Sequence, residues 1–163
     1  MPRITFALAT MLSFMAFTPV AAQDYQKGYD AYQAGEYATA LKEFRPLAEQ
    51  GNALLQTVVG DMYRKGKGVT QDYAEATKWY HLAAEQGKAQ AQYNLGFSYA
   101  TGLGVLQDNI IAHMWWNLAA ANGHEKAGEW RDERAGLMTN ADISKAQAMA
   151  RECMSSGYKK CGD

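Results

Sequence analysis

The chain has 163 residues, and its 16 basic and 17 acidic side chains give a formal net charge of −1 at pH 7. Domains that bind nucleic acid carry a basic face that neutralises phosphates, so this charge balance argues against a nucleic-acid partner. The length is that of one domain, which can bury roughly two thirds of the surface of its unfolded chain.

The first 22 residues have the pattern of a cleavable export signal. Arg3 supplies one positive charge, residues 4–17 carry no charge and are mostly apolar, and small residues at 20–22 precede a cleavage position at Gln23. The pattern predicts a signal peptide over residues 1–22 and a folded product over residues 23–163. That product is expected in the periplasm or outside the cell, with no stable membrane insertion after cleavage.

An uncleaved membrane anchor is the alternative for this segment. The uncharged stretch of residues 4–22 approaches the roughly 20 residues that span a bilayer. Pro19 and the small residues after it are more typical of a cleavage region than of the end of a spanning helix. Cleavage would remove Arg3 and leave 15 basic and 17 acidic residues, a net charge of −2.

Residues 24–51 have apolar and small residues at three- and four-residue steps, which predicts two helices. A short Gly35-Glu36-Tyr37 turn separates them. The segment resembles a short tetratricopeptide-like unit. The residues that carry this resemblance are Gly28, Tyr32, Gly35, Tyr37, Ala40, Phe44, Leu47, Ala48 and Gly51.

Residues 52–87 and 88–123 repeat each other with a period of 36. A fixed period of this length is typical of stacked structural units. The residues of the first unit that recur identically 36 positions later are Gly60, Tyr63, Gly66, Gly68, Val69, Gln71, Asp72, Ala76, Trp79, Leu82, Ala83, Ala84 and Gly87.

Each of these units is predicted to form two helices joined by a glycine-containing loop. Asp72 and Asp108 stand where an N-cap is expected, and recurrence at the same point of each unit favours capping over a pair of catalytic acids. Trp79 and Trp115 are also equivalent, which favours packing between units over a platform for sugar stacking. The glycine pairs follow helices rather than strands, so they indicate turns and not phosphate loops.

The pattern in residues 88–123 resembles the Sel-one-like repeat (SLR) family, a relative of the tetratricopeptide repeats. The residues that carry the resemblance are Leu95, Gly96, Tyr99, Gly102, Gly104, Val105, Asp108, Ala112, Trp115, Ala119, Ala120 and Gly123. The resemblance implies an all-α fold, a short right-handed α-solenoid of stacked antiparallel helix hairpins. It also implies a non-catalytic scaffold that binds other proteins.

Residues 124–157 are predicted to close the stack with two more helices. Ala127 and Trp130 indicate a further first helix, and Thr139 with Asp142 has the form of a capping box at the start of the last helix. Terminal repeats of such arrays are expected to be atypical.

Cys153 and Cys161 form a lone pair, which favours a disulfide in an exported protein. A straight helix would separate their Cα atoms by about 12 Å, beyond the roughly 7 Å that a disulfide tolerates. The chain must therefore reverse between them, and Gly157 is placed to end the helix in a left-handed conformation. Two free thiols or a metal site are the alternatives.

No residues are assigned to catalysis, to a metal or to a cofactor. Ser156 and Lys159 have the serine-to-lysine spacing of penicillin-recognising enzymes, but the two further motifs of those enzymes are missing. His81, His113 and His124 lack the close spacing of a metal site and are interpreted as surface or helix-end residues.

Function is expected on the concave face of the stack, where the first helix of each unit presents side chains to a ligand. By analogy with tetratricopeptide repeats, a protein or peptide partner would contact Tyr29, Gln33, Thr57, Asp61, Arg64, Lys65, Tyr93, Phe97 and Thr101. The alternatives are a penicillin-recognising or other envelope hydrolase-like activity and a structural oligomer built through an incompletely capped end.

Overall fold

The computed structural model describes residues 19–161. Most of the predicted signal peptide, residues 1–18, lies outside the described residues, and the predicted cleavage position before Gln23 falls within the first helix. Among the described helices, none combines the length and the apolar character that a membrane crossing requires.

Eight helices and no strands make up the described part of the chain, which confirms the predicted all-α fold. They are α1 (Pro19–Gln33), α2 (Tyr37–Glu49), α3 (Ala53–Lys65), α4 (Tyr73–Ala84), α5 (Ala89–Thr101), α6 (Asn109–Ala121), α7 (Ala127–Ala135) and α8 (Asn140–Ser155).

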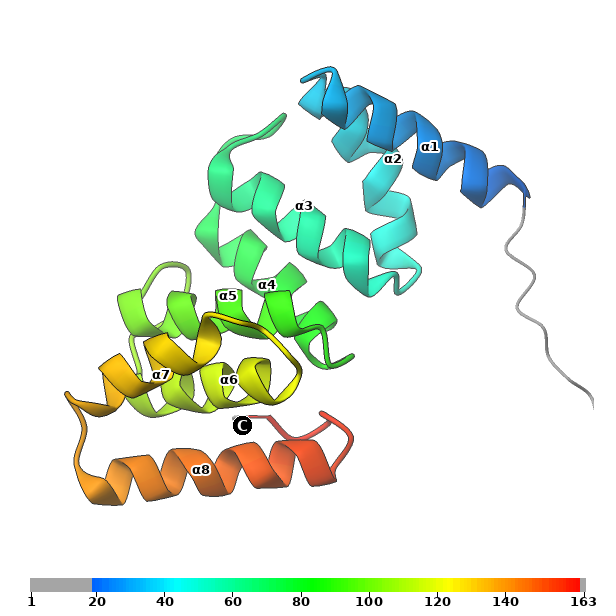
Figure 1. Ribbon diagram of the computed structural model, residues 1–163. Coiled ribbons are helices and arrows are strands. Elements are labelled where there is room, and N and C mark those ends of the chain that lie inside the picture. The colour runs from blue at the N-terminus through cyan, green and yellow to red at the C-terminus, as the bar shows by residue number, and fades with distance from the viewer. Residues whose placement is uncertain (1–18, 162–163) are drawn as a thin grey trace, which may run out of the picture.

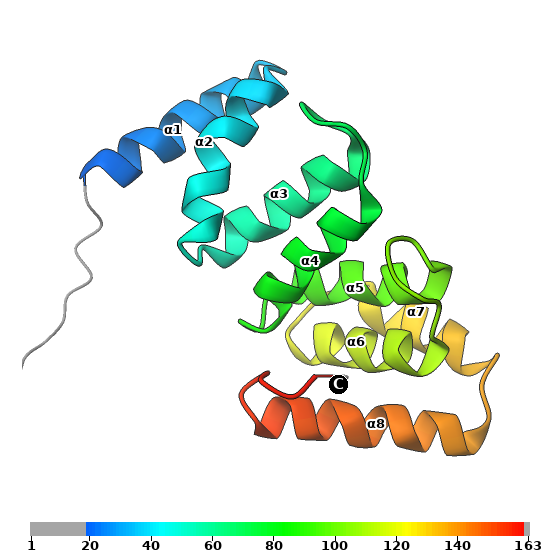
Figure 2. The same ribbon diagram turned by 180° about the vertical axis from the view of Figure 1, so that it is seen from behind.

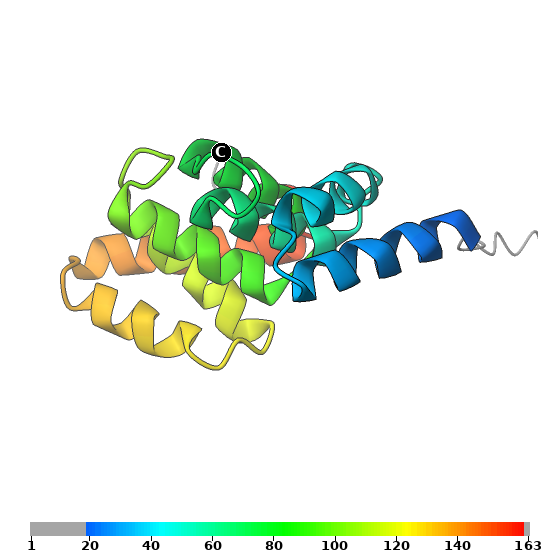
Figure 3. The same cartoon turned by 90° about the horizontal axis from the view of Figure 1, so that it is seen from above.

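The first six helices form three stacked hairpins (Figure 1). Helices α1 and α2, α3 and α4, and α5 and α6 pack as pairs, and the second helix of each pair also packs on the first helix of the next. The N-terminal end of α1 projects beyond the rest of the stack (Figure 3). Each hairpin therefore buries its apolar faces largely against its neighbours, as expected for a solenoid.

Caps define the ends of the repeated helices. The side chain of Asp72 accepts a hydrogen bond from the backbone N–H of Glu75, and that of Asp108 accepts from Ile110 and Ile111. Gly66 ends α3 in the left-handed conformation, with a φ of 65°. The predicted N-caps and the interpretation of the glycines as turn residues are both confirmed.

A glycine in the first helix of each hairpin makes room for an aromatic ring of the second. A Cβ added at Gly60 would lie 2.6 Å from the Tyr80 ring, and one at Gly96 would lie 2.4 Å from the Trp116 ring. These separations are far shorter than the roughly 3.5–4.0 Å at which non-bonded carbon atoms make contact, so only glycine fits at either position. The two units therefore use the same packing device, one period apart.

Buried glutamines link successive hairpins through the carbonyl groups at helix ends. Gln56 Nε2 donates to the carbonyl oxygen of Ala48 at 3.0 Å, and one period later Gln92 Nε2 donates to that of Ala84 at 3.1 Å. Both glutamines are buried, and each Oε1 accepts from the side-chain amide of a residue at the end of its own hairpin, Gln86 or Asn122. Each of these carbonyl oxygens also accepts from the backbone N–H of the glycine three residues later, so the glutamine adds a second bond that joins one hairpin to the next.

The last two helices depart from the hairpin pattern. Both pack against α6, and α8 runs along a different side of α6 from α7 (Figure 1, Figure 2). Thr139 and Asp142 form the predicted capping box at the start of α8. Helix α8 buries Ala146, Ala150 and Cys153 in the main core.

The chain reverses after α8 and returns to the stack. Gly157 and Tyr158 both have a φ of 65°, and a disulfide joins Cys153 to Cys161 with Cα atoms 4.6 Å apart. The Tyr158 hydroxyl donates to Oδ1 of Asn122 at 2.9 Å, and its ring lies against Gly87 in the turn between α4 and α5. The tail thus spans the ends of two hairpins.

Candidate functional site

The first helices α1, α3 and α5 present side chains that differ from one hairpin to the next. Tyr29, Asp61 and Phe97 each directly follow a glycine that receives an aromatic ring, so they occupy equivalent positions. All three are at least partly exposed, while buried positions such as those of Trp79 and Trp115 keep the same residue. Packing between units restricts the residue at such buried positions and leaves the exposed ones freer to vary.

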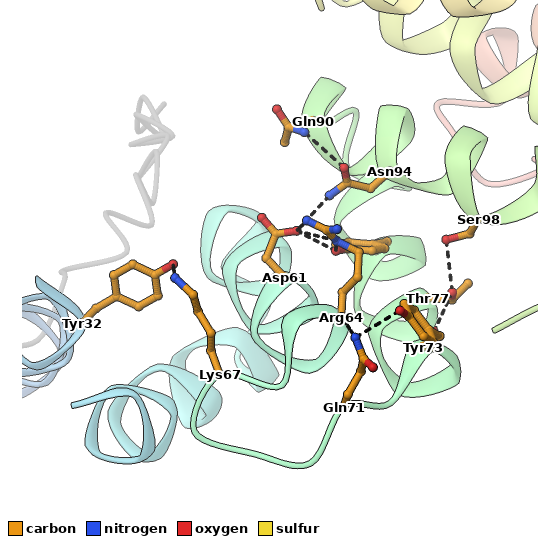
Figure 4. A network of polar contacts seen from close by, with 11 residues as sticks. Tyr32, Asp61, Arg64, Lys67, Gln71, Tyr73, Thr77, Gln90, Asn94 and Ser98 are labelled. Atoms are coloured by element: carbon orange, nitrogen blue, oxygen red, sulfur yellow. Dashed lines mark hydrogen bonds and ion pairs between the residues drawn. The ribbon is translucent and has the colours of Figure 1, made fainter. Parts of the chain in front are cut away.

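Asp61 is the centre of a polar network that joins three helices (Figure 4). Its Oδ1 accepts from the Tyr80 hydroxyl at 2.7 Å, from Nε of Arg64 at 3.4 Å and from Nδ2 of Asn94 at 3.4 Å. Arg64 Nε also lies 3.2 Å from the Tyr80 hydroxyl, and Gln90 donates to Asn94. The network ties α3 to α4 and α5, so Asp61 and Arg64 have structural partners as well as solvent exposure.

The Tyr80 hydroxyl acts as a hydrogen-bond donor in this network. Burial of Tyr80 and, next, the negative charge of Asp61 raise the pKa of its phenol well above the usual value. Both causes disfavour the phenolate, so the proton stays on Tyr80 and points to Asp61. The carboxylate is consequently held in one place by a donor that does not ionise.

A groove of about 290 Å³ opens between α1, α2 and α3. Tyr29 and Leu54 on its walls are 44% and 47% exposed, which is high for large apolar side chains. The groove brings together three of the predicted partner-binding residues, Tyr29, Gln33 and Asp61. Its full lining is Tyr25, Tyr29, Tyr32, Gln33, Phe44, Leu54, Leu55, Val58 and Asp61.

Three other predicted residues lie together on α5, outside the lining of this groove. Tyr93 stacks on the His124 ring with centroids 4.1 Å apart, and Phe97 packs against the cluster that contains Trp116. The Thr101 hydroxyl donates to the carbonyl oxygen of Phe97 at 2.8 Å. Lys65, at the end of α3, is exposed.

Thr57 does not belong to the exposed face. It is only 5% exposed, and its hydroxyl donates to the carbonyl oxygen of Ala53 one turn earlier in α3. A side chain so placed cannot reach a partner, so Thr57 is removed from the proposed binding surface. The equivalent position in α5 is Tyr93, whose larger side chain is partly exposed.

Most residues of the groove wall were missed by the sequence analysis. Leu54 and Val58 precede Asp61 by seven and three positions, so they lie on the same side of α3. This spacing, which places them on the exposed stripe of the helix, was the signal that could have found them. Tyr25, Tyr32 and Phe44 come from α1 and α2, and only the packing of the first hairpin on α3 brings them to the groove.

Ser156 has a structural role in the turn after α8. Its Oγ donates to the carbonyl oxygen of Cys153 at 2.8 Å and accepts from the backbone N–H groups of Lys159 and Lys160. The serine-to-lysine spacing therefore reflects a backbone turn that the serine hydroxyl closes.

The interpretation of all three histidines as surface or helix-end residues was wrong for His113. This residue lies in the middle of α6, is 2% exposed, and has a buried Nδ1 atom without a hydrogen-bond partner among the described residues. Burial and, next, the positive charge of Arg131 lower the pKa of His113, while Asp132 opposes this shift. No group of three or more potential metal ligands was found in the described part of the chain.

Acid is expected to destabilise the protein partly through His113. A lowered pKa means that folding favours the neutral imidazole, so its contribution is fully present above the ordinary pKa of 6.5 and is lost as the pH falls through the lower folded-state pKa. Urea unfolding at about pH 7.5 and about pH 5.5 should show a smaller loss of stability in the variant His113→Thr, which carries the residue found at the equivalent position 77. An equal loss in both proteins would contradict the assignment.

Comparison with known proteins identifies similar sequences and folds. The family model of the Sel1 repeat matches residues 54–88 and 89–124. The crystal structure of a protective antigen present in uropathogenic Escherichia coli strains, which displays an SLR fold, has a TM-score of 0.77 and 27% sequence identity, over 85% of this chain and 31% of the antigen. A Sel1 repeat protein from Oxalobacter formigenes has a TM-score of 0.63 and 32% identity, over 69% of this chain and 88% of that one.

The match to the Oxalobacter formigenes protein covers most of that chain, whereas the match to the antigen covers under a third of it. No protein of curated function matches the sequence.

Proposed function

This chain belongs to the Sel1 repeat family, whose fold is a scaffold for protein interaction, and we propose that it is an exported, non-catalytic scaffold that holds a protein or peptide partner. The partner is proposed to bind across the exposed side of α1, α3 and α5. An extended peptide or a loop would suit this surface, since the exposed side chains come from successive helices.

The observation that carries this proposal is the contrast between buried and exposed positions of the repeat. Several buried positions keep the same residue from unit to unit, as Trp79 and Trp115 do, whereas Tyr29, Asp61 and Phe97 are an aromatic residue, an acid and an aromatic residue at one equivalent position. Aromatic side chains with polar neighbours are typical of residues that anchor a partner. The groove beside Tyr29 supplies a concave, partly apolar surface of the kind that ligands occupy.

Two observations support export. Residues 1–22 have the sequence pattern of a signal peptide, and the only two cysteines of the chain are joined in a disulfide, which persists in oxidising compartments. The periplasm or the outside of the cell is the proposed location.

Substitutions on the exposed side of the first helices are expected to abolish partner capture. Tyr29, Lys65 and Thr101 are all exposed, so the triple variant Tyr29→Ala, Lys65→Ala, Thr101→Ala should fold normally and lose most of the partner. Wild type and variant would be expressed in a bacterium with their own residues 1–22 and recovered from the envelope fraction. The amount of protein that co-purifies with each is then compared.

The matched control changes two exposed residues of α4 and its exposed C-cap residue, with Lys78→Ala, Leu82→Ala and Glu85→Ala. This control should keep full partner recovery, because α4 is a second helix of its hairpin. Equal recovery by the two triple variants would refute binding on the exposed side of α1, α3 and α5. The same preparation tests export, since the recovered wild-type chain is expected to begin at Gln23.

A further inference from the structure

We propose that the groove between α1, α2 and α3 binds a cationic side chain, an arginine or a lysine, of the partner. This inference rests on the proposed function for the existence of a partner, and it adds the chemistry of the residue that the groove receives. Three features of the groove support it: its aromatic walls, its single charge and the open oxygen of that charged group.

The walls of the groove are built from a continuous set of aromatic rings. Tyr25 stacks near Tyr29 with centroids 6.4 Å apart, and both Tyr25 and Tyr32 lie beside Phe44 with centroid separations of 6.2 and 6.4 Å. The face of an aromatic ring carries a partial negative charge and attracts ammonium and guanidinium groups. A cation that enters this groove therefore meets several rings at once.

The same aromatic cluster already holds one ammonium group of the chain itself. Lys67 Nζ lies 5.1 Å from the centroid of the Tyr32 ring and 4.4 Å from that of the Tyr37 ring. Lys67 is not part of the groove lining, so it leaves the groove open. Its ammonium group also donates to the hydroxyls of Tyr32 and Tyr37, at 3.5 and 3.1 Å. One ring of the groove wall, that of Tyr32, is therefore already in contact with a cation.

Asp61 is the one charged group among the described residues that line the groove. All of its hydrogen bonds with described residues reach Oδ1, and Figure 4 shows the other carboxylate oxygen directed away from that network. Arg64, which pairs with Oδ1, does not line the groove. Oδ2 of Asp61 therefore remains able to accept a hydrogen bond from a ligand.

The chemistry of the groove discriminates between occupants. An anionic side chain would meet the carboxylate of Asp61, while Arg64, which offsets part of that charge, lies outside the lining and offers the anion no contact there. A purely apolar side chain would cover Oδ2 without supplying a donor, which leaves a charged oxygen unsatisfied. Arginine and lysine combine an apolar stem for the rings with charged donors for Oδ2, so they satisfy both parts of the groove.

Titration with a blocked arginine tests this assignment directly. N-acetyl-arginine amide, added to the full chain and followed by ¹H–¹⁵N NMR, is expected to shift amide signals of α1 and α3 in a saturable way. Blocked citrulline, which has the same shape without the charge, should bind at least about fivefold more weakly, the effect of one cation–π contact. Blocked glutamate should not bind.

Two variants separate the contributions of the acid and the rings. Asp61→Asn keeps an acceptor for the Tyr80 hydroxyl and should weaken arginine binding by roughly tenfold, since a hydrogen bond to a charged group is lost. Tyr29→Leu removes a π face at an exposed position and should weaken it by about fivefold. Glu85→Gln makes the same charge change at an exposed site outside the groove and should have no effect.

Equal binding of arginine and citrulline, or stronger binding of glutamate, would overturn the inference. Unchanged arginine binding by Asp61→Asn with a native circular dichroism spectrum would also overturn it. If the chain captures a partner on α1, α3 and α5 while arginine leaves the amide signals of α1 and α3 unchanged, the cation assignment fails and the proposed function stands. If arginine binds the groove and no partner is captured, the proposed function fails and the cation site stands.

Discussion

Replacing Gly104 with alanine is expected to lower the free energy of unfolding by about 3 kcal/mol or more, because two separate penalties add. The residue has a φ of 81°, a conformation that L side chains rarely adopt. An added Cβ would also lie 2.2 Å from the carbonyl oxygen of Tyr73. That oxygen belongs to the first turn of α4, which the cap formed by Asp72 holds in place, so the clash cannot be relieved by a side-chain movement.

Gly123 provides a matched control for the backbone penalty alone. Its φ is 88°, and a Cβ added there would meet nothing within 4 Å. Gly123→Ala should therefore cost only about 1 kcal/mol. Urea unfolding followed by circular dichroism gives both values. A similar loss in the two variants would show that the loop does not pack on α4 as the structure has it.

Breaking the disulfide is expected to cost about 2 kcal/mol and to release the C-terminal tail. Cys153 is fully buried in the core, and the bridge to Cys161 holds Tyr158 against the turn at Gly87. The Tyr158 hydroxyl bonds to Asn122, which in turn donates to Gln92. Without the bridge, the tail residues regain conformational freedom. The hydrogen bond from Tyr158 to Asn122 is then lost.

Cys161→Ser tests this expectation with little change in packing, because Cys161 is only partly buried. The variant should unfold at lower urea concentration than the oxidised wild type and should match the reduced wild type. Addition of a thiol reductant should then have no effect on the variant. Tyr158→Phe, with the disulfide intact, should lose about 1 kcal/mol, the contribution of a single hydrogen bond. If the oxidised wild type and Cys161→Ser were equally stable, the tail would have no clamping role.

The candidate site was only partly predictable from the sequence. Tyr29, Gln33 and Asp61 were predicted by analogy with tetratricopeptide repeats, and all three line the groove. The prediction that Thr57 is exposed to a partner was wrong. A threonine can be buried in a helix because its hydroxyl donates a hydrogen bond to a carbonyl of the same helix, as Thr57 does to Ala53. The groove itself needed rings from α1 and α2 beside α3, a relation between segments that no spacing within one helix records.

The sequence by itself determined the features that depend on near neighbours along the chain: the helical period, the Asp72 and Asp108 caps, the capping box at Thr139 and the left-handed turns at glycine. These follow from hydrogen bonds that span only a few residues, so the residue types are sufficient evidence. The 36-residue period also predicted packing between helices, because equivalent residues of stacked units contact equivalent neighbours.

Only the tertiary structure decided how unlike segments meet. It placed α8 along α6, buried His113 in α6, set Tyr158 on Asn122, and assigned Gly104 a second role as the point where a loop touches the backbone of α4. The contact at Gly104 does recur one period earlier, where Gly68 lies against the backbone of Tyr37 and Ala38. The contacts of α8 and of Tyr158 do not recur with the period among the described residues, so no comparison between units could reveal them. Each depends on shapes and distances that arise when residues remote in sequence pack into one dense interior.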